Sequence, residues 1–257
     1  MKVPIFNLEG QEIGKTDLPA VFKEPIREDL ILRAFLATMS KKRQPYGVNV
    51  LAGKRTSAHY HGVRRTRYTM MGRELARLPR LHGQTVPYMM FRARFVPQAV
   101  KGREAHPPKV EKIWVQKINK KERRKAIKSA IAATASKECV LKRGHKIGDL
   151  QLPIVIDDRI QEIAKTKDIL AILKKIGLEN ELKRLKKRKI GAHKYKVPRG
   201  PLFVITEDKG ISKAVSNIPG VDICQIDKLG IEHLAPGGVC GRLTIFTKSA
   251  IEKLKGR

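Results

Sequence analysis

The sequence predicts an α/β fold, with a mostly parallel sheet covered by helices on both faces (α/β/α) and a long extended internal loop. Three observations support this prediction. Five short apolar runs are typical of buried strands, amphipathic segments with helical spacing alternate with them, and a basic central stretch shows neither pattern. We therefore expect residues 1–40 and 110–257 to form one α/β globular body, into which residues 41–109 are inserted as an extended basic loop.

The predicted strands are apolar runs that lack the polar alternation of a half-exposed strand. Such runs are typical of strands buried on both faces, as in a parallel sheet covered by helices. We therefore expect strands and helices to alternate along the body. The five runs are Val3–Phe6, Pro153–Ile156, Leu202–Ile205, Val221–Ile226 and Leu243–Phe246.

Four amphipathic helices are predicted in the body. Pro25 suits the first turn of the first helix, and Gly177 suits the end of the third. Asn119 and Glu122 have the spacing of a capping box at the start of the second. The positions expected to face the core are Leu32, Phe35, Leu36 and Met39 in the first helix, Ile127, Ala130, Ile131 and Thr134 in the second, Ile169, Ile172, Leu173 and Ile176 in the third, and Leu178, Leu182 and Leu185 in the fourth.

The chain carries a large and uneven excess of positive charge. It has 55 Lys and Arg against 24 Asp and Glu, which gives a formal net charge of +31. Such a charge suits a chain that works against a dense polyanion, either nucleic acid or an anionic membrane surface. Residues 1–40 have five basic and six acidic side chains, whereas residues 41–109 have sixteen basic and two acidic ones. The polyanion is therefore expected mainly at the central stretch.

The membrane alternative is the weaker one. No stretch approaches the roughly 18 apolar residues that a spanning helix needs, and the first ten residues lack the apolar core of a signal peptide. The glycines and prolines of residues 41–109 forbid the long amphipathic helix of a surface-bound chain. Cys139, Cys224 and Cys240 show no disulfide framework. We therefore expect a cytoplasmic protein with no membrane partner.

Residues 41–109 have little means of folding alone. No isoleucine lies between Ile31 and Ile113, and at most a short helix such as Thr69–Leu78 is expected. Ordering each residue costs about 1–2 kcal/mol of backbone entropy, and the segment lacks the apolar content to offset that cost. We therefore expect this segment to be disordered in the isolated chain and to gain its order from a partner.

The side chains of this segment indicate an RNA partner. Arginine offers a planar fork for phosphates and stacks on bases, and aromatic rings stack on unpaired bases. The helix or ribbon of a duplex-DNA reader is not apparent. Six aromatic residues lie among the basic ones, namely Tyr46, Tyr60, Tyr68, Tyr88, Phe91 and Phe95. The expected RNA contacts are Lys54, Arg55, Arg64, Arg65, Arg67, Arg73, Arg77, Arg80, Arg92, Arg94, Lys101 and Arg103.

The fourth predicted helix runs into a second basic segment. Six of the seven residues from Lys183 to Lys189 are basic. The segment is either a solvated charged face or a phosphate contact, and we favour the contact because six like charges repel one another unless an anion lies opposite. The expected RNA contacts here are Lys183, Arg184, Lys187 and Arg188.

Motifs of catalysis or of cofactor binding do not stand out. His59 and His61 form a close pair, but their neighbours are arginines rather than carboxylates or cysteines, so we expect no metal site. Asp157 and Asp158 follow a predicted strand, where an α/β enzyme often places acids, yet a helix-capping pair explains them better. Pro236–Gly241 is either a tight turn or a set of backbone amides that face phosphate. We expect no cofactor and no enzymatic activity, and an RNA-modifying enzyme is the alternative.

Several motifs are specific enough, taken together, to indicate a family. They are Leu51–Ala58, Arg77–Arg80, Lys142–Ile147 with Leu152–Val155, and Pro236–Ala250. In this order, and over nearly the whole chain, they resemble the ribosomal protein L-four family of the large subunit. Because the sequence stops at Arg257, without the long C-terminal extension of eukaryotic members, the resemblance is to the archaeal type.

The resemblance implies a structural constituent of the large ribosomal subunit that binds large-subunit rRNA and supports subunit assembly. The extended loop would reach the wall of the polypeptide exit tunnel, where it would meet universal large-subunit protein twenty-two. Other large-subunit proteins would be further partners, and the chain would not be a homo-oligomer. By position in the loop, the tunnel-facing tip would carry Arg80, His82, Gln84 and Arg92.

Overall fold

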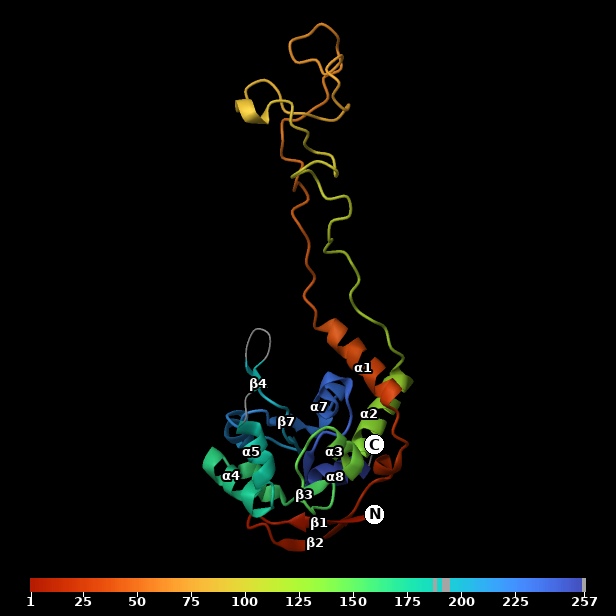
Figure 1. Cartoon of the computed structure of the whole chain (residues 1–257). Coiled ribbons are helices and arrows are strands. Elements are labelled where there is room, and N and C mark those ends of the chain that lie inside the picture. The colour runs from red at the N-terminus through yellow and green to blue at the C-terminus, as the bar shows by residue number, and fades with distance from the viewer. Residues whose placement is uncertain (187–188, 191–194, 256–257) are drawn as a thin grey trace. The chain divides into compact units, whose positions relative to one another are not determined.

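The computed structural model describes residues 1–186, 189–190 and 195–255 of the chain. The chain divides into two units, one formed by Met1–Lys42 with Val115–Arg257 and the other by Arg43–Trp114. We call the first unit the body and the second the excursion (Figure 1). In the described part of the chain, no helix is both long enough and apolar enough to cross a membrane.

The body is built on a six-stranded sheet with the strand order β2-β1-β3-β8-β6-β7. Neighbouring strands are parallel except β1 and β2, which pair antiparallel at one edge. The predicted α/β fold with a mostly parallel sheet is therefore confirmed. The strands are β1 (Lys2–Phe6), β2 (Glu12–Asp17), β3 (Ile154–Ile156), β6 (Leu202–Ile205), β7 (Asp222–Gln225) and β8 (Thr244–Thr247), while β4 (Lys189–Ile190) and β5 (Tyr195–Lys196) form a separate antiparallel pair.

The helices of the body lie on both faces of the sheet (Figure 1). The four predicted helices are present as α1, α2, α4 and α5, and the described residues form four further α-helices. The α-helices are α1 (Glu28–Lys41), α2 (Lys120–Ala135), α3 (Lys137–Lys142), α4 (Thr166–Lys175), α5 (Glu179–Lys186), α6 (Ile211–Ser216), α7 (Ile231–Leu234) and α8 (Lys248–Lys255). Single 3-10 turns are η1 (Ala20–Lys23), η2 (Pro87–Met89), η3 (Asp158–Glu162), η4 (Ile226–Lys228) and η5 (Pro236–Gly238).

Successive residues of the central strands enter two different hydrophobic cores. In β6, Leu202 and Val204 join the core formed with α1, α2, α7 and α8. Phe203 and Ile205 join the core formed with α3, α4, α5 and α6. Because both faces of each strand are covered, the strand sequence has no polar alternation. The layers are therefore helices, sheet and helices, as predicted.

The apolar face predicted for α1 differs from the structure. Leu32, Leu36 and Met39, which are predicted to face the core, are 46, 48 and 42% exposed. The buried residues of α1 are instead Ile31, Ala34 and Ala37. Pro25 also lies before α1 rather than in its first turn, since the helix begins at Glu28.

Three further local predictions differ from the structure. β2 is not predicted, because it is an edge strand whose six residues are all exposed or half-buried. Asn119 precedes α2, but its side chain caps no backbone N–H among the described residues. Thr69–Leu78 forms turns rather than a helix, since Gly72 and Glu74 have positive φ angles of 76° and 56°.

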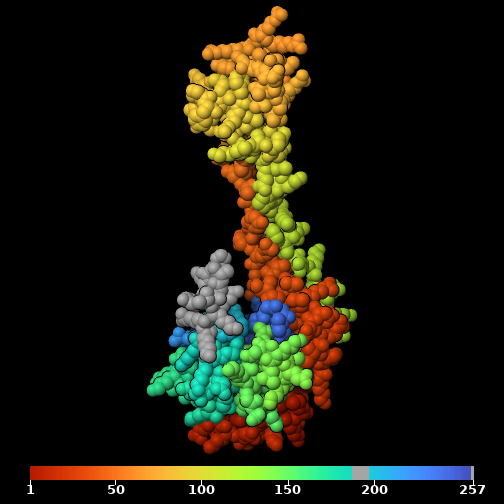
Figure 2. All heavy atoms as spheres, viewed as in Figure 1, coloured from red at the N-terminus to blue at the C-terminus, as the bar shows by residue number. Residues whose placement is uncertain are grey.

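The excursion consists of two chain arms that run side by side (Figures 1 and 2). The arms touch where Val48 N–H donates to the carbonyl of Pro108 at 3.3 Å. Further along, His59 and Arg80 exchange backbone hydrogen bonds of 3.3 and 3.0 Å. Gly102 lies so close to the carbonyl of Val96 that a Cβ atom there would clash with it. Backbone hydrogen bonds between the two arms thus hold the excursion together.

The excursion has almost no hydrophobic core. Only Met70 and Arg94 are buried among its residues in the described part of the chain. Side chains disfavour positive φ, at a cost of about 1–3 kcal/mol per residue, and internal packing offsets little of this strain. Among the described residues, those other than glycine with positive φ, at 56–72°, all lie in the excursion and are Arg65, Glu74, Phe91, Phe95 and Lys101.

Candidate nucleic-acid interface

Most of the predicted RNA contacts in the excursion are open to solvent. Arg103 and Arg80 are half-buried, and Arg94 is buried. An exposed guanidinium or ammonium group can meet a phosphate without first breaking internal contacts. The exposed group comprises Lys54, Arg55, Arg64, Arg65, Arg67, Arg73, Arg77, Arg92 and Lys101.

Arg80 and Arg94 have internal partners. Arg80 donates from Nη1 to the carbonyl of Phe91 at 2.8 Å and from Nη2 to that of Ala76 at 3.0 Å. Arg94, which is 8% exposed, donates to the carbonyl of Val100. Both side chains therefore hold neighbouring turns together. Their contact with RNA stays a prediction.

Basic side chains of the excursion lie over aromatic rings. The Cζ atom of Arg43 and the Nζ atom of Lys112 lie 4.1 and 4.5 Å from the centroid of the Trp114 ring. Tyr46 stacks on the same ring, and Arg73 lies 4.5 Å from Phe91. These planar groups can also stack on bases. Trp114 is not among the predicted contacts, although a lone tryptophan among basic residues is a usable signal.

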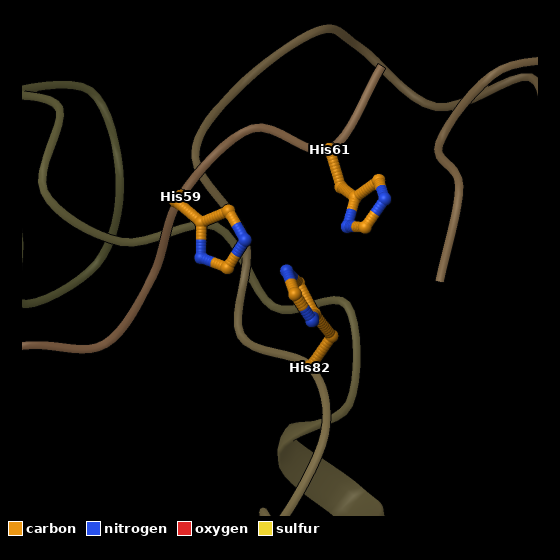
Figure 3. A group of neighbouring side chains, drawn as sticks. All are labelled: His59, His61 and His82. Atoms are coloured by element: carbon orange, nitrogen blue, oxygen red, sulfur yellow. The ribbon is translucent and has the colours of Figure 1, made fainter. Parts of the chain in front are cut away.

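Three histidines meet in the excursion (Figure 3). The ring centroids of His59 and His82 are 4.2 Å apart, and those of His61 and His82 are 5.5 Å apart. Backbone pairing of Arg80 with His59 brings His82 beside the pair that the sequence indicates. Desolvation, and to a lesser extent His59 and His61, lowers the pKa of His82.

On the body, the basic helix α5 is built around a buried carboxylate. The Glu181 side chain is fully buried, and its Oε1 accepts from His145 Nδ1 at 2.7 Å. Its two oxygens also accept from Arg184 at 2.5 and 2.8 Å and from the Lys146 backbone N–H at 3.0 Å. Burial opposes ionisation, but these donors outweigh it and lower the pKa of Glu181 to about 2. The carboxylate therefore stays charged inside the body.

This network changes what the basic run of α5 can offer to an anion. Arg184 is held by Glu181, and it also donates to the carbonyl of Arg199 at 2.6 Å. Lys183 is exposed and pairs with Glu179 at 2.9 Å. The remaining predicted contacts, Lys187 and Arg188, lie outside the described residues. Phosphate contact by this run stays a prediction.

Two of the sequence motifs that carry the family resemblance meet in space. Arg143, within Lys142–Ile147, donates from Nη2 to the carbonyl of Pro236 at 2.7 Å and from Nη1 to that of Val239. Gly241 has a φ of 79°, and a Cβ atom there would lie 2.5 Å from the backbone of Cys139. The structure therefore shows Pro236–Gly241 as a tight turn whose carbonyls face Arg143.

Arg242, which follows this turn, is a structural residue. It is 1% exposed, and it donates from Nε and Nη1 to the carbonyls of Gly200 and His233, both at 2.9 Å. Its Nη2 donates to Asp222 Oδ2 at 2.6 Å. Burial lowers the pKa of Arg242, and Asp222 counteracts that shift. Through these hydrogen bonds the guanidinium, which lies just before β8, connects the residue before Pro201 and β6, the first residue of β7, and α7.

The paired acids after β3 also have structural partners. Asp157 Oδ1 accepts from the backbone N–H of Asp158 at 2.9 Å and caps η3. Asp158 Oδ1 accepts from the backbone N–H and the hydroxyl of Ser249, at 3.0 and 2.6 Å. Asp157 therefore caps a helical turn, as predicted for the pair, whereas Asp158 holds Ser249 in the first turn of α8.

The α/β body is covered on both faces of its sheet, and the charged residues of its motifs have partners inside the body. The excursion is rich in arginine and has almost no core. These two features define a class of protein that assembles with a structured polyanion. The chain belongs to the ribosomal protein L4/L1 family, whose sequence profile matches residues 16–257. The predicted family is confirmed.

Archaeal relatives match the whole chain. It is 48% identical to large ribosomal subunit protein uL4 of Methanocaldococcus jannaschii, over 100% of this chain and 99% of that protein. The protein of the same name from Nanoarchaeum equitans is 46% identical, over 100% and 98%. That of Methanopyrus kandleri is 44% identical, over 100% and 99%. The family comprises structural ribosomal proteins, which confirms the prediction of no enzymatic activity and excludes the RNA-modifying enzyme.

Proposed function

We propose that the chain is a structural constituent of the large ribosomal subunit, where it binds large-subunit rRNA and supports assembly of the subunit. Its family and the names of its relatives support the ribosomal assignment. As a ribosomal component, the protein is cytoplasmic.

The exposed arginines of the excursion are the observation that carries the proposal of rRNA binding. Sixteen basic and two acidic residues lie in 41–109, and the side chains of Arg64, Arg65 and Arg67 are exposed there. A segment with this charge and almost no core requires many phosphates to become compact. We therefore assign rRNA binding to residues 41–109 and the supporting fold to residues 1–40 and 110–257.

We assign the tunnel-facing tip to the same segment. Gln84 and Arg92 are exposed there, as a tunnel wall requires. Arg80 and His82 lie beside them with internal contacts, so they would hold the tip rather than line it. The partner at the tip would be universal large-subunit protein twenty-two, and the chain would act as a single copy.

Replacing residues 54–103 with a short glycine-serine linker tests the proposal. The body should keep its unfolding transition, because the replaced residues contribute no part of its two cores. Binding to large-subunit rRNA and incorporation into subunits should fall sharply. For the intact chain, contact with six to ten phosphates predicts a decrease in affinity of about 10³–10⁵ between 50 and 200 mM salt. Unchanged incorporation of the shortened chain would contradict the proposal.

A further inference from the structure

We propose that His59, His61 and His82 form a binding site for Zn²⁺ or a similar first-row divalent cation. The three rings lie in the excursion and turn nitrogen atoms toward a shared space (Figure 3). The chemistry of these three residues carries the proposal independently of the ribosomal function.

The spacing of the three rings suits a small metal ion. One nitrogen from each ring lies within 4.8 Å of those of the other two. Ligand nitrogens around a tetrahedral zinc, at Zn–N distances near 2.0–2.1 Å, are about 3.3 Å apart. Side-chain rotation that closes the nitrogens by up to about 1.5 Å therefore completes three positions of the tetrahedron.

Hydrogen bonds around the cluster leave one nitrogen of each ring available. His59 Nδ1 lies 3.2 Å from the carbonyl of Ser57, so a proton on Nδ1 donates there and leaves the lone pair of Nε2 free. Thr66 Oγ1 lies 3.1 Å from His61 Nε2, which leaves Nδ1 of that ring. A backbone carbonyl or hydroxyl behind a metal-binding histidine is the usual way to fix the ring and its tautomer.

His82 supplies the most direct sign of a missing ligand. Its Nε2 is buried and makes no hydrogen bond to any of the described residues. A buried polar atom left unpaired has a free-energy cost and requires an explanation. A metal ion bound at Nε2 would remove that cost.

The donor set selects the kind of cation. Imidazole nitrogens suit zinc, copper and nickel, whereas magnesium and calcium prefer oxygen ligands. Arg64, Arg65 and Arg67 oppose a cation, but their exposure lets solvent and salt screen them. Three protein ligands leave a fourth position for water or an anionic oxygen. The expectation of no metal site is therefore revised, because His82 adds a third ligand to the pair that the sequence indicates.

Metal binding would stabilise the fold of the excursion, which has almost no hydrophobic core. The ion would join His59 and His61 on one segment to His82 on another and so close the chain between them. Closing a loop restricts the unfolded chain, and metal binding then contributes directly to folding. The closed loop contains the exposed arginines Arg64, Arg65, Arg67, Arg73 and Arg77.

Zinc titration of the full chain tests the proposal. Wild-type protein stripped with a chelator should take up zinc from zinc-buffered solution, measured by mass spectrometry of the metal, and magnesium should not compete. His61→Gln and His82→Gln should each weaken zinc affinity at least about tenfold, since even an outer contact of a metal ligand contributes that much. His106→Gln, which changes an exposed histidine of the same excursion, should leave the affinity unchanged.

A second readout uses cobalt as a spectroscopic substitute for zinc. The wild-type chain and His106→Gln should show the visible absorption of tetrahedral cobalt, and His82→Gln should lose it. Absence of zinc uptake by the wild-type chain would overturn the proposal, as would equal zinc affinity in His82→Gln. A decrease in rRNA affinity in His82→Gln with unchanged zinc affinity would also overturn it, because the cluster would then be an RNA contact.

Discussion

Arg242 in the body and Arg64 in the excursion place the same guanidinium group in opposite surroundings. Arg242 is 1% exposed, and Asp222 and two backbone carbonyls accept its hydrogen bonds. Arg64 is exposed in a unit that has almost no core. The donors of Arg242 are therefore used in folding, whereas those of Arg64 remain for a ligand.

The comparison extends to the two units as a whole. The body covers both faces of its sheet and satisfies the charged Glu181 with donors from three residues. The excursion contains five non-glycine residues in strained backbone conformations and offsets little of that strain internally. The basic residues behind the net charge of +31 are thus of two kinds. Some hold the body together, and others are exposed on the excursion, where we propose that they bind rRNA.

The largest effect is expected when the buried arginine of the body is removed. Arg242→Met leaves the carbonyls of Gly200 and His233 without their donor and deprives Asp222 of its closest partner. The free energy of unfolding should fall by about 3–5 kcal/mol, as measured by urea denaturation. Arg199→Met is the matched control, because Arg199 pairs with the same carboxylate from an exposed position and should change stability by at most about 1 kcal/mol.

Acid should weaken the body through Glu181. Its pKa is lowered from 4.5 to about 2 in the folded chain, so its contribution is complete above about pH 4.5 and disappears as pH falls toward 2. That contribution amounts to about 3 kcal/mol. Urea denaturation at several pH values should show this decrease in the wild type. The decrease in stability toward acid should be smaller in Glu181→Gln by the contribution of this one carboxylate. Glu179→Gln, which changes an exposed carboxylate, should keep nearly the whole decrease. Equal curves for all three proteins would contradict the assignment.

The smallest effect on stability is expected for the exposed arginines of the excursion. Replacing Arg64, Arg65 and Arg67 together with glutamine should change the stability of the body by less than about 0.5 kcal/mol. The salt slope of rRNA binding should nevertheless decrease by about one for each phosphate that is no longer neutralised. The charge-matched control replaces the exposed body residues Lys15, Lys165 and Lys167 with glutamine and should keep the wild-type slope. If the two triple variants had equal salt slopes of rRNA binding, the exposed basic residues of the excursion would not differ from those of the body in their contact with phosphate.

The sequence predicts the body well where local pattern and burial agree. β3, β6 and β8 are buried on both faces, so their apolar runs identify them directly. β2 escapes prediction because an exposed edge strand carries no such pattern. Thr69–Leu78 has plausible helical composition, but nothing in a coreless unit fixes it as a helix.

The partners of the charged residues are harder to predict, since tertiary structure decides them. Arg184 resembles an exposed basic residue in sequence, yet the fold holds it between Glu181 and the carbonyl of Arg199. His82 joins His59 only because Arg80 pairs with His59 across the excursion. Composition identifies the segment that we propose binds RNA, and the structure separates its exposed arginines from those that hold turns.

Hydrogen exchange of the full chain, in zinc-free solution with and without large-subunit rRNA, tests the dependence of the excursion on a partner most directly. Without rRNA, amides of β3, β6 and β8 should be strongly protected, while those of the excursion should exchange at rates near those of an unfolded chain. On addition of rRNA, the excursion should gain protection and the body should change little. Strong protection of the excursion in the free chain, or no gain with rRNA, would contradict this dependence.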